Sequence, residues 1–457
     1  MKASFFRIPA IPVLIGLFLL VARPSGATVF EVLGVGARSS AMLVGTATAQ
    51  GPACVFYNPG ALTRAEDTEV HAGFQMTQVS LEINGRDIDE EELTTTLMGV
   101  VHPTDLLGPK IAIGALLSLP FQRVSRFLTL PLDQPQFIYY GTRNQRLVVT
   151  AAGAVQITDW LSVGAGLQVL LDTFSEPDFT LVQDADTTND FTNPNADALE
   201  AQSFGFANAV EQPVLAPAAG ILLTPFPGLR LGVTYRGQVK STISAPLKVT
   251  IEEVNLGGLF VAQSRFLLPN EGEVFFSPQQ VSGGLAYTTP EETWTVEVDA
   301  TWFDFSAFPP TFPAGLPSFT GGLGELILPV PGFLPLKPPS KDVVVPALGV
   351  EWRPYGGKSM DLWLRGGYAY RPTMLDEDRS LTNYLDTTSH VIGAGFGLEF
   401  RNWSRFVPKP LSIDAYAQVH ILKERDILKD DLASSRFGDL RIGGILYGGG
   451  LEATLRF

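Results

Sequence analysis

The chain has 457 residues, a formal net charge of −15 at neutral pH and one cysteine. The negative charge disfavours a nucleic-acid partner, because phosphate backbones are bound by clustered Lys and Arg. The single cysteine, Cys54, excludes an internal disulfide and is expected to be a buried apolar residue. Mean hydropathy is positive, at +0.17, and only 17% of the residues are charged. Such a chain must enclose a large core or expose apolar surface to lipid.

Residues 1–27 have the pattern of a secretory signal peptide. Lys2 and Arg7 precede an apolar run over residues 8–22, and small residues follow up to Ala27. The run is shorter than a transmembrane helix normally requires. A retained signal anchor is the alternative. We therefore expect an exported protein whose mature chain begins at Thr28.

Residues 28–67 are rich in Gly, Ala and Ser and also contain aromatic and branched apolar residues. The segment is too polar to span lipid, and its apolar content is too high for a disordered chain. We predict an N-terminal hatch (plug) folded inside the lumen of a barrel. A disordered periplasmic tail is the alternative.

From residue 68 onward, apolar residues alternate with polar or small ones with a period of two, which is typical of β-strands. Charged residues recur on the polar face, and a wet lumen accommodates them where a dry core would not. We therefore expect the apolar face to contact lipid. Fourteen strands are predicted near residues 68–82, 95–103, 109–120, 143–157, 160–173, 212–224, 228–250, 272–289, 292–305, 342–353, 359–371, 388–401, 410–423 and 438–457.

The predicted connections are alternately short and long, with long loops at 121–142, 174–211, 251–271, 306–341 and 424–437. This alternation is typical of barrels in the outer membrane of Gram-negative bacteria, whose short turns face the periplasm. The predicted fold is all-β: a fourteen-stranded antiparallel transmembrane barrel over residues 68–457, enclosing the hatch. Its last strand ends at Phe457, which should lie at the periplasmic rim beside Thr68 and resembles the signal read by the barrel-assembly machinery.

The loop 306–341 contains nine prolines and almost no charge before Lys337. This much apolar surface on a loop indicates either packing on neighbouring segments or capture of an apolar ligand. The candidate ligand-binding residues there are Phe308, Phe312, Phe319, Leu326, Leu328 and Phe333.

The stretch from Gly36 to Leu62 ends in FYNPGAL and resembles the hatch of FadL/TodX-type outer-membrane transporters of hydrophobic compounds, in which the signature is Asn-Pro-Ala. Here Gly60 takes the third position. Later segments, such as AAGILLTPFPGLRLGVTYRGQVK and LWLRGGYAYRPTMLDEDR, resemble the paired strands of the same family in the same order.

The resemblance implies uptake of long-chain fatty acids, hydrocarbons or aromatic compounds. Loops would capture the ligand, the hatch would gate its passage, and it would leave sideways into the membrane. Position by position, the moving hatch element would comprise Phe56, Asn58, Pro59 and Gly60, and Lys341 would lie near a ligand carboxylate. Residues 174–211 contain no basic residue where fatty-acid transporters of the family have a cation, so Arg123 or Arg126 would have to substitute for it, or the ligand is neutral. Gly114 is a candidate for a wall kink.

The alternative from another class is a FadL-like barrel that serves as a secretion-system shuttle or adaptor for exported proteins. No catalytic, metal or cofactor motif is apparent, because the four histidines are dispersed and lack metal-ligand spacing. His420 and Asp414 lie on one face of a strand, but a structural hydrogen-bond network explains them better than an enzymatic dyad. We expect a monomeric, non-enzymatic protein whose partners are outer-membrane lipid and a hydrophobic small molecule.

Overall fold

The computed structural model describes residues 32–457 except for short segments, which are 89–91, 106–108, 122–124, 127–134, 141–144, 171–172, 176–177, 186–198, 208, 212, 245–246, 252–253, 257–258, 262–263, 269–270, 309–317, 322–338, 377–383, 402, 404–408 and 430–437. Within residues 171–212, 241–275 and 309–338, and in the short strands β5 (Ser125–Arg126) and β7 (Gln145–Arg146), only the backbone is described. The predicted signal peptide lies outside the described residues.

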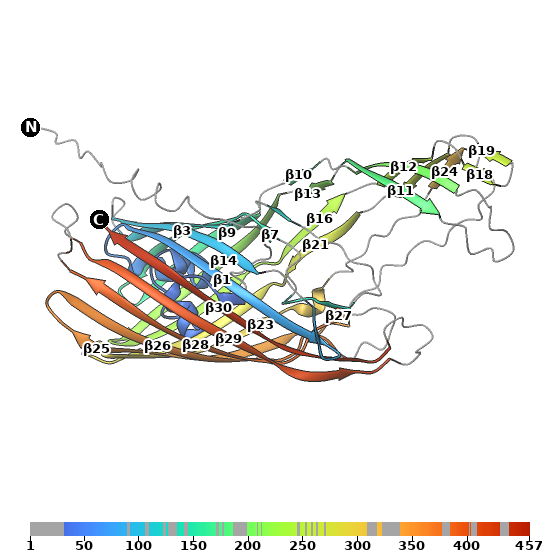
Figure 1. The fold of residues 1–457 in the computed structure, drawn as a ribbon. Helices are drawn as coiled ribbons and strands as arrows, with labels where there is room; N and C mark the ends of the chain where they lie inside the picture. Colours follow the sequence, from blue (N-terminus) through green and yellow to red (C-terminus); the bar gives the residue numbers. More distant parts are fainter. Residues whose placement is uncertain are drawn as a thin grey trace, which may run out of the picture.

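The fold is a closed antiparallel barrel of fourteen strands (Figure 1). In order around the barrel they are β1 (Glu69–Ile83), β3 (Leu93–Thr104), β4 (Ile111–Pro120), β8 (Val148–Thr158), β9 (Leu161–Leu170), β14 (Val214–Phe226), β15 (Leu229–Arg236), β22 (Gln280–Thr288), β23 (Trp294–Phe303), β25 (Val343–Gly356), β26 (Met360–Arg371), β28 (Ser389–Phe400), β29 (Leu411–Ile427) and β30 (Leu440–Arg456). The two-residue β2 (Arg86–Asp87) folds back after a turn and pairs with the last two residues of β1. The predicted antiparallel barrel and its number of strands are confirmed.

The barrel closes where β30 pairs with β1 along their whole length, from Glu69 opposite Arg456 to Ile83 opposite Ile442. The backbone N–H of Phe457 donates to the Thr68 carbonyl oxygen at 3.0 Å, so the last residue lies beside the start of the first strand, as predicted. Short turns surround this end of the barrel and the long connections leave the opposite end (Figure 1). We call these ends the turn side and the loop side.

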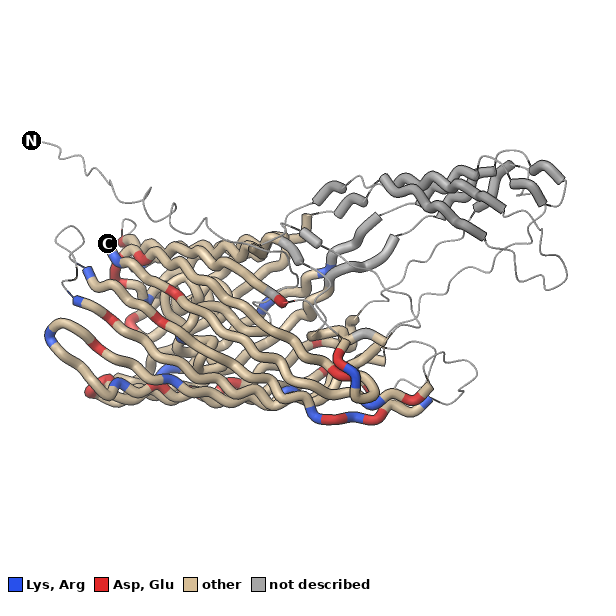
Figure 2. Tube along the Cα trace, in the orientation of Figure 1, with Lys and Arg blue, Asp and Glu red and all other residues tan. Residues whose placement is uncertain are grey.

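The strands place apolar side chains outward and polar ones inward. On β23, Val296 and Val298 are 40% and 51% exposed, whereas Glu297 is fully buried. On the outer surface near the turn side, Trp294 and Trp352 stack with their ring centroids 5.2 Å apart, as expected for an interfacial aromatic girdle. In Figure 2, charged residues gather at the two ends, and long stretches of strand between them have none. The outer surface is therefore suited to lipid.

Three expectations about the wall and loops were wrong. The predicted strands 228–250 and 272–289 are each interrupted, the first at Gly237 and the second at Pro278. Only the second interruption follows from a proline, which cannot donate to the ladder. Beyond these points the chain continues as β16 (Val239–Ser244) and β21 (Glu271–Ser277), which pair with each other. Gly114 does not mark a kink, since β4 pairs without a register shift with both neighbours.

Additional strands occur in the predicted loops 174–211 and 251–271 and at the end of the predicted strand 228–250. These are β10 (Thr173–Ser175), β11 (Asp178–Ala185), β12 (Leu199–Ala207), β13 (Ala209–Glu211), β17 (Leu247–Ile251), β18 (Val254–Leu256), β19 (Leu259–Val261) and β20 (Ser264–Leu268), with β24 (Ser318–Gly321) from the third long loop. They pair backbone to backbone in small sheets separate from the barrel.

The N-terminal segment, which we define as residues 32–67, lies inside the barrel (Figure 1). It contains α3 (Ala37–Met42), η1 (Gly51–Ala53), α4 (Cys54–Tyr57) and η2 (Pro59–Arg64), and nearly every residue from Leu33 to Thr63 is buried or half-buried. Cys54 is buried, as expected. No helix in the described part of the chain is long and apolar enough to span a membrane.

Candidate functional site

Glycines on the inner wall provide the surface on which the N-terminal segment rests. A Cβ atom added to Gly220 would lie 2.1 Å from Asn58 Oδ1, and one added to Gly164 would lie 2.5 Å from the Pro59 carbonyl carbon. The Asn58 side-chain amide donates to the Ile221 carbonyl oxygen on β14 at 3.0 Å. The predicted hatch motif therefore lies directly against the wall, where only glycine leaves room for its backbone.

Two carboxylates on β23 hold the turn between α3 and η1. Asp299 Oδ2 accepts hydrogen bonds from the backbone N–H groups of Gly45 and Thr46, at 3.0 and 3.1 Å, and from the Thr46 hydroxyl at 2.8 Å. Glu297 accepts the Ala47 N–H at 2.6 Å and the Thr48 hydroxyl. Buried hydrogen bonds to charged groups contribute about 1.5–3 kcal/mol each, so this contact anchors the segment strongly.

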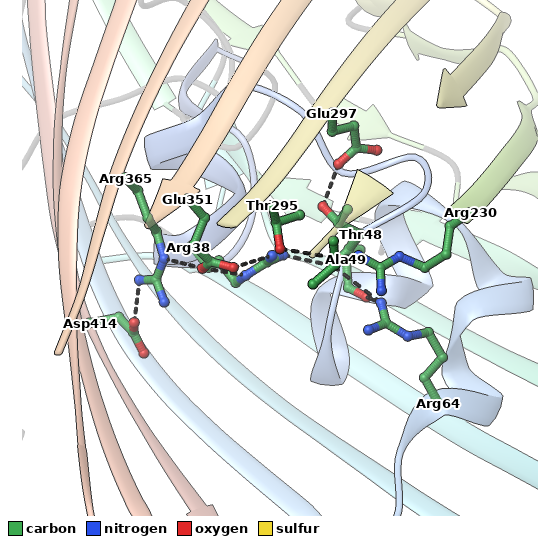
Figure 3. Close-up of polar contacts among 11 residues, drawn as sticks. Arg38, Thr48, Ala49, Arg64, Arg230, Thr295, Glu297, Glu351, Arg365 and Asp414 are labelled. Carbon is green, nitrogen blue, oxygen red and sulfur yellow. Dashed lines mark hydrogen bonds and ion pairs between the residues drawn. The ribbon is translucent and has the colours of Figure 1, made fainter. Parts of the chain in front are cut away.

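A chain of ion pairs joins the segment to the next strands on the turn side (Figure 3). Arg38 donates to both oxygens of Glu351 at 2.7 and 2.8 Å, and Arg365 also donates to Glu351, at 2.7 Å. Arg365 pairs in addition with Asp414. Because bidentate guanidinium–carboxylate pairs fix both distance and orientation, this network sets the position of α3 against the wall.

On the loop side of the segment lies a cavity of about 220 Å³, which we call the loop-side cavity. The wall, the segment and a loop all contribute to it. Its aromatic lining consists of Phe56, Tyr57, Tyr139, Tyr140, Phe276, Phe303 and Phe305. Polar side chains, including Thr234, Gln280 and Asp299, also line it. A concave site that combines aromatic rings with polar groups is typical of binding sites for small molecules.

Two arginines face the loop-side cavity, each stacked on an aromatic ring. Arg236 lies 3.6 Å from the centre of the Phe56 ring, and Arg371 lies 2.9 Å from that of Tyr139. Arg371 is 7% exposed, and its Nη2 atom has no hydrogen-bond partner among the described residues. A guanidinium that lines a cavity attracts the π-face of an aromatic ligand.

The wall beside this cavity is incomplete at one seam. The ladder between β25 and β26 ends at Ala347 opposite Ala369 and resumes only where the Lys341 N–H donates to the Met374 carbonyl oxygen. Pro346 and Pro372 lie within the interval, and neither residue has an N–H to donate. The lining residues Val345 and Ala347 border the seam on one side, and Ala369 and Arg371 border it on the other. The neighbouring seams β23–β25 and β26–β28 stay paired at the same level.

On the turn side of the segment lies a second cavity, of about 490 Å³, which we call the turn-side cavity. It is lined mainly by charged side chains, including Arg38, Arg64, Arg230, Glu351 and Arg365. The two cavities thus differ in chemistry although the same barrel encloses both.

The structure separates the predicted ligand-binding residues. Phe308 is buried in an apolar cluster at the loop side, and its ring centroid lies 4.9 Å from that of Phe276. Lys341 is half-exposed and pairs with Asp376 at 2.6 Å. Arg123, Phe312, Leu326, Leu328 and Phe333 lie outside the described residues, and only the backbone of Arg126 and Phe319 is described.

The sequence analysis missed most residues of the loop-side cavity. Arg236 and Arg371 both follow a tyrosine at the loop-side end of a strand, on the inward parity, so counting inward positions along each strand would have found them. Tyr139, Tyr140 and Phe305 come from connections, where no periodicity indicates direction. His420 bonds to Gln418 at 3.1 Å and Asp414 pairs with Arg365, which supports the network interpretation of these two residues.

The class of protein follows from this geometry. A closed barrel with an apolar outer face, a polar lumen and its own N-terminal segment inside is a transmembrane barrel of the Gram-negative outer membrane.

Comparison with solved structures agrees with this class. The chain is similar to a FadL homologue of Pseudomonas aeruginosa, with a TM-score of 0.58 and 15% identity over 95% of this chain and 99% of that one. It is also similar to the toluene transporter TbuX of Ralstonia pickettii (0.52; 16%; 94% and 100%) and to the monoaromatic hydrocarbon channel CymD (0.52; 15%; 94% and 99%). At these identities the likeness shows the fold, and the resemblance to FadL/TodX-type transporters is confirmed at that level. No protein-family model and no curated protein matches the sequence.

Proposed function

We propose that this protein carries hydrophobic small molecules across the outer membrane without an energy source. The aromatic loop-side cavity supports this proposal most directly. A dry apolar cavity of roughly 150 Å³ is enough to hold benzene, so the 220 Å³ found here has room for a one-ring aromatic compound or part of an aliphatic chain. Three of the solved structures with this fold are named as toluene transporters or hydrocarbon channels, which agrees with that size.

In this proposal the N-terminal segment is a hatch. It lies between the two cavities and is held by polar contacts at separate points, namely Asn58, Glu297 and Glu351. A ligand that binds the loop-side cavity more tightly when the hatch is displaced would shift the hatch toward that state. Arg123, Phe308 and Lys341 remain candidates for capture at the loop side, together with the other loop residues named from the sequence.

We place the lateral exit at the seam between β25 and β26. Strands that lack ladder hydrogen bonds separate at lower cost than paired ones, and both sides of this seam line the cavity. On the outer surface beside the seam, Val344 and Tyr370 are 51% and 37% exposed. A ligand that leaves through the seam would enter lipid there.

The hatch claim is tested by a disulfide between hatch and wall. Thr63 Oγ1 and Ser162 Oγ are 2.8 Å apart, so cysteines at these positions can bridge η2 to β9 with little movement. Oxidised T63C/S162C should take up radiolabelled toluene in whole cells at least tenfold more slowly than the reduced form. The control is T288C/T295C, whose hydroxyls are 2.9 Å apart on two adjacent wall strands outside the loop-side cavity. Equal uptake by locked and reduced hatch variants would overturn gating.

The exit claim has its own test. Oxidised P346C/Y370C would close the seam between β25 and β26, whereas Y370C/H390C spans the continuous ladder between β26 and β28. We expect toluene uptake to fall only in the first variant and to return with reductant. Unchanged uptake in the first variant would move the exit elsewhere and leave the transport function standing. Absence of toluene and laurate uptake in the unmodified protein would instead refute the function and favour the adaptor alternative.

A further inference from the structure

Three arginines of the turn-side cavity have no carboxylate partner among the described residues. Arg353 lies over the Trp363 ring and donates to the Glu291 carbonyl oxygen, whereas Arg64 and Arg230 lie together. Arg64, at the end of η2 in the hatch, reaches only the carbonyl oxygens of Thr48 and Ala49, at 3.5 and 3.4 Å. Arg230, on β15, donates to the Thr288 hydroxyl at 2.5 Å, while its Nε atom is buried without a partner. Figure 3 shows the two guanidinium groups pointing toward each other from the hatch and from the wall.

Most other charged side chains around the turn-side cavity have a partner of opposite charge. Arg38 and Arg365 share Glu351, His71 lies between Glu69 and Glu452, Arg401 pairs with Asp361, and Arg456 pairs with Glu69 and Glu399. Inward-facing charges in this part of the barrel are thus matched almost throughout. Of the described arginines without a carboxylate partner in this cavity, Arg64 and Arg230 are the two whose guanidinium groups face each other.

The groups around Arg64 and Arg230 make their two positive charges less favourable. Arg38 and Arg64 donate to the same Thr48 carbonyl oxygen, so a third guanidinium lies close by. The two nearby carboxylates already accept hydrogen bonds from other groups. Glu297 binds the hatch backbone, and Glu351 binds Arg38 and Arg365. Like charges held together at reduced dielectric repel each other unless a counter-charge binds between them.

We propose that an oxyanion binds between Arg64 and Arg230 and ties the hatch to β15. A carboxylate or phosphate has two or more oxygens and can accept from both guanidiniums at once, including the unpartnered Nε of Arg230. The site opens into the turn-side cavity, so its anion comes from the periplasmic side or is the acidic head of an amphiphile that has passed the hatch. Occupancy would hold the hatch closed. This inference concerns the hatch itself and does not require that hydrophobic transport be correct.

Calorimetry on the purified protein in neutral detergent and low-chloride buffer tests the site. Inorganic phosphate, acetate and laurate are titrated separately. Binding of phosphate or acetate identifies a small periplasmic anion, and binding of laurate alone identifies the acidic head of an amphiphile. Either is expected to weaken at least tenfold in R230Q and in R64Q. R401Q is the control, because Arg401 lines the same cavity but already pairs with Asp361. No binding by any of the three, or equal binding in R230Q, overturns the proposal.

Cys54 supplies a second readout, because it is the chain's only cysteine and lies buried in the hatch. The bound anion should slow maleimide labelling of Cys54 at least threefold in the unmodified protein and leave R230Q unaffected. R230Q removes one of two like charges, so it should fold and, without anion, unfold at a temperature no lower than the unmodified protein. If the anion changes the rate of Cys54 labelling in neither protein, the anion does not hold the hatch against the wall.

Discussion

The two cavities on either side of the hatch share one barrel but differ in almost every side chain. The loop-side cavity is lined by aromatic rings and two stacked arginines, whereas the turn-side cavity is lined by ion pairs. An apolar molecule gains free energy by leaving water for the first and gains nothing among the hydrated charges of the second. This contrast favours a sideways route at the seam over passage straight through the lumen.

The largest expected effect is a loss of stability when the ion-pair network of the turn-side cavity is disrupted. Arg365 is held by Glu351 and Asp414, and R365M would leave two buried carboxylates without this partner. Removing one member of a buried ion pair costs about 3–5 kcal/mol. We expect a clear fall in the urea midpoint of the purified barrel, while toluene affinity of the folded fraction is unchanged. R401M, which removes a more exposed partner of Asp361, is the control.

A smaller effect is expected where the hatch rests on the wall between the two cavities. G220A would bring a Cβ atom to 2.1 Å from Asn58 Oδ1, whereas G283A would meet nothing within 4 Å. Overpacking costs about 1–3 kcal/mol. Cys54 reports the result, because burial raises the pKa of its thiol to about 12 and keeps it unreactive while it is covered. Labelling should be at least fivefold faster in G220A and unchanged in G283A. Equal rates would show that the hatch does not rely on this glycine.

The barrel strands could be predicted from the sequence, because a polar lumen and an apolar outer face give each strand a two-residue period. The location of residues 32–67 inside the barrel could be predicted from their apolar and aromatic content. The contacts that hold the hatch were not available from it. The strand pattern predicts that Glu297 and Asp299 face inward, but it does not predict their partners. The backbone groups that they bind lie about 250 residues earlier in the chain. The seam was hidden for a similar reason. Pro346 and Pro372 each suggest an edge or an irregularity, but their meeting across one seam depends on how β25 and β26 align.

The next prediction concerns the aromatic side. Ala369 points into the loop-side cavity and is 7% exposed, whereas its neighbour Tyr368 points outward and is 43% exposed. A369W would fill much of the cavity, and we expect toluene uptake to fall about tenfold, equivalent to ~1.4 kcal/mol. Y368W exchanges one lipid-facing aromatic ring for another and should transport normally. Normal uptake in A369W would show that ligands bypass this cavity.

The smallest expected effect concerns Lys341, which the family resemblance places near a ligand carboxylate. Its ammonium group is 48% exposed and pairs with Asp376, which is 60% exposed. Exposed pairs of this kind contribute about 0.2–1 kcal/mol, so K341Q should leave the stability of the barrel nearly unchanged. If the side chain guides acids toward the cavity, K341Q lowers laurate uptake severalfold at low ionic strength, less at high salt, and leaves toluene uptake unchanged. An equal loss for both ligands would instead indicate that Lys341 acts by holding the adjoining seam, since its backbone N–H makes the first bond beyond the gap.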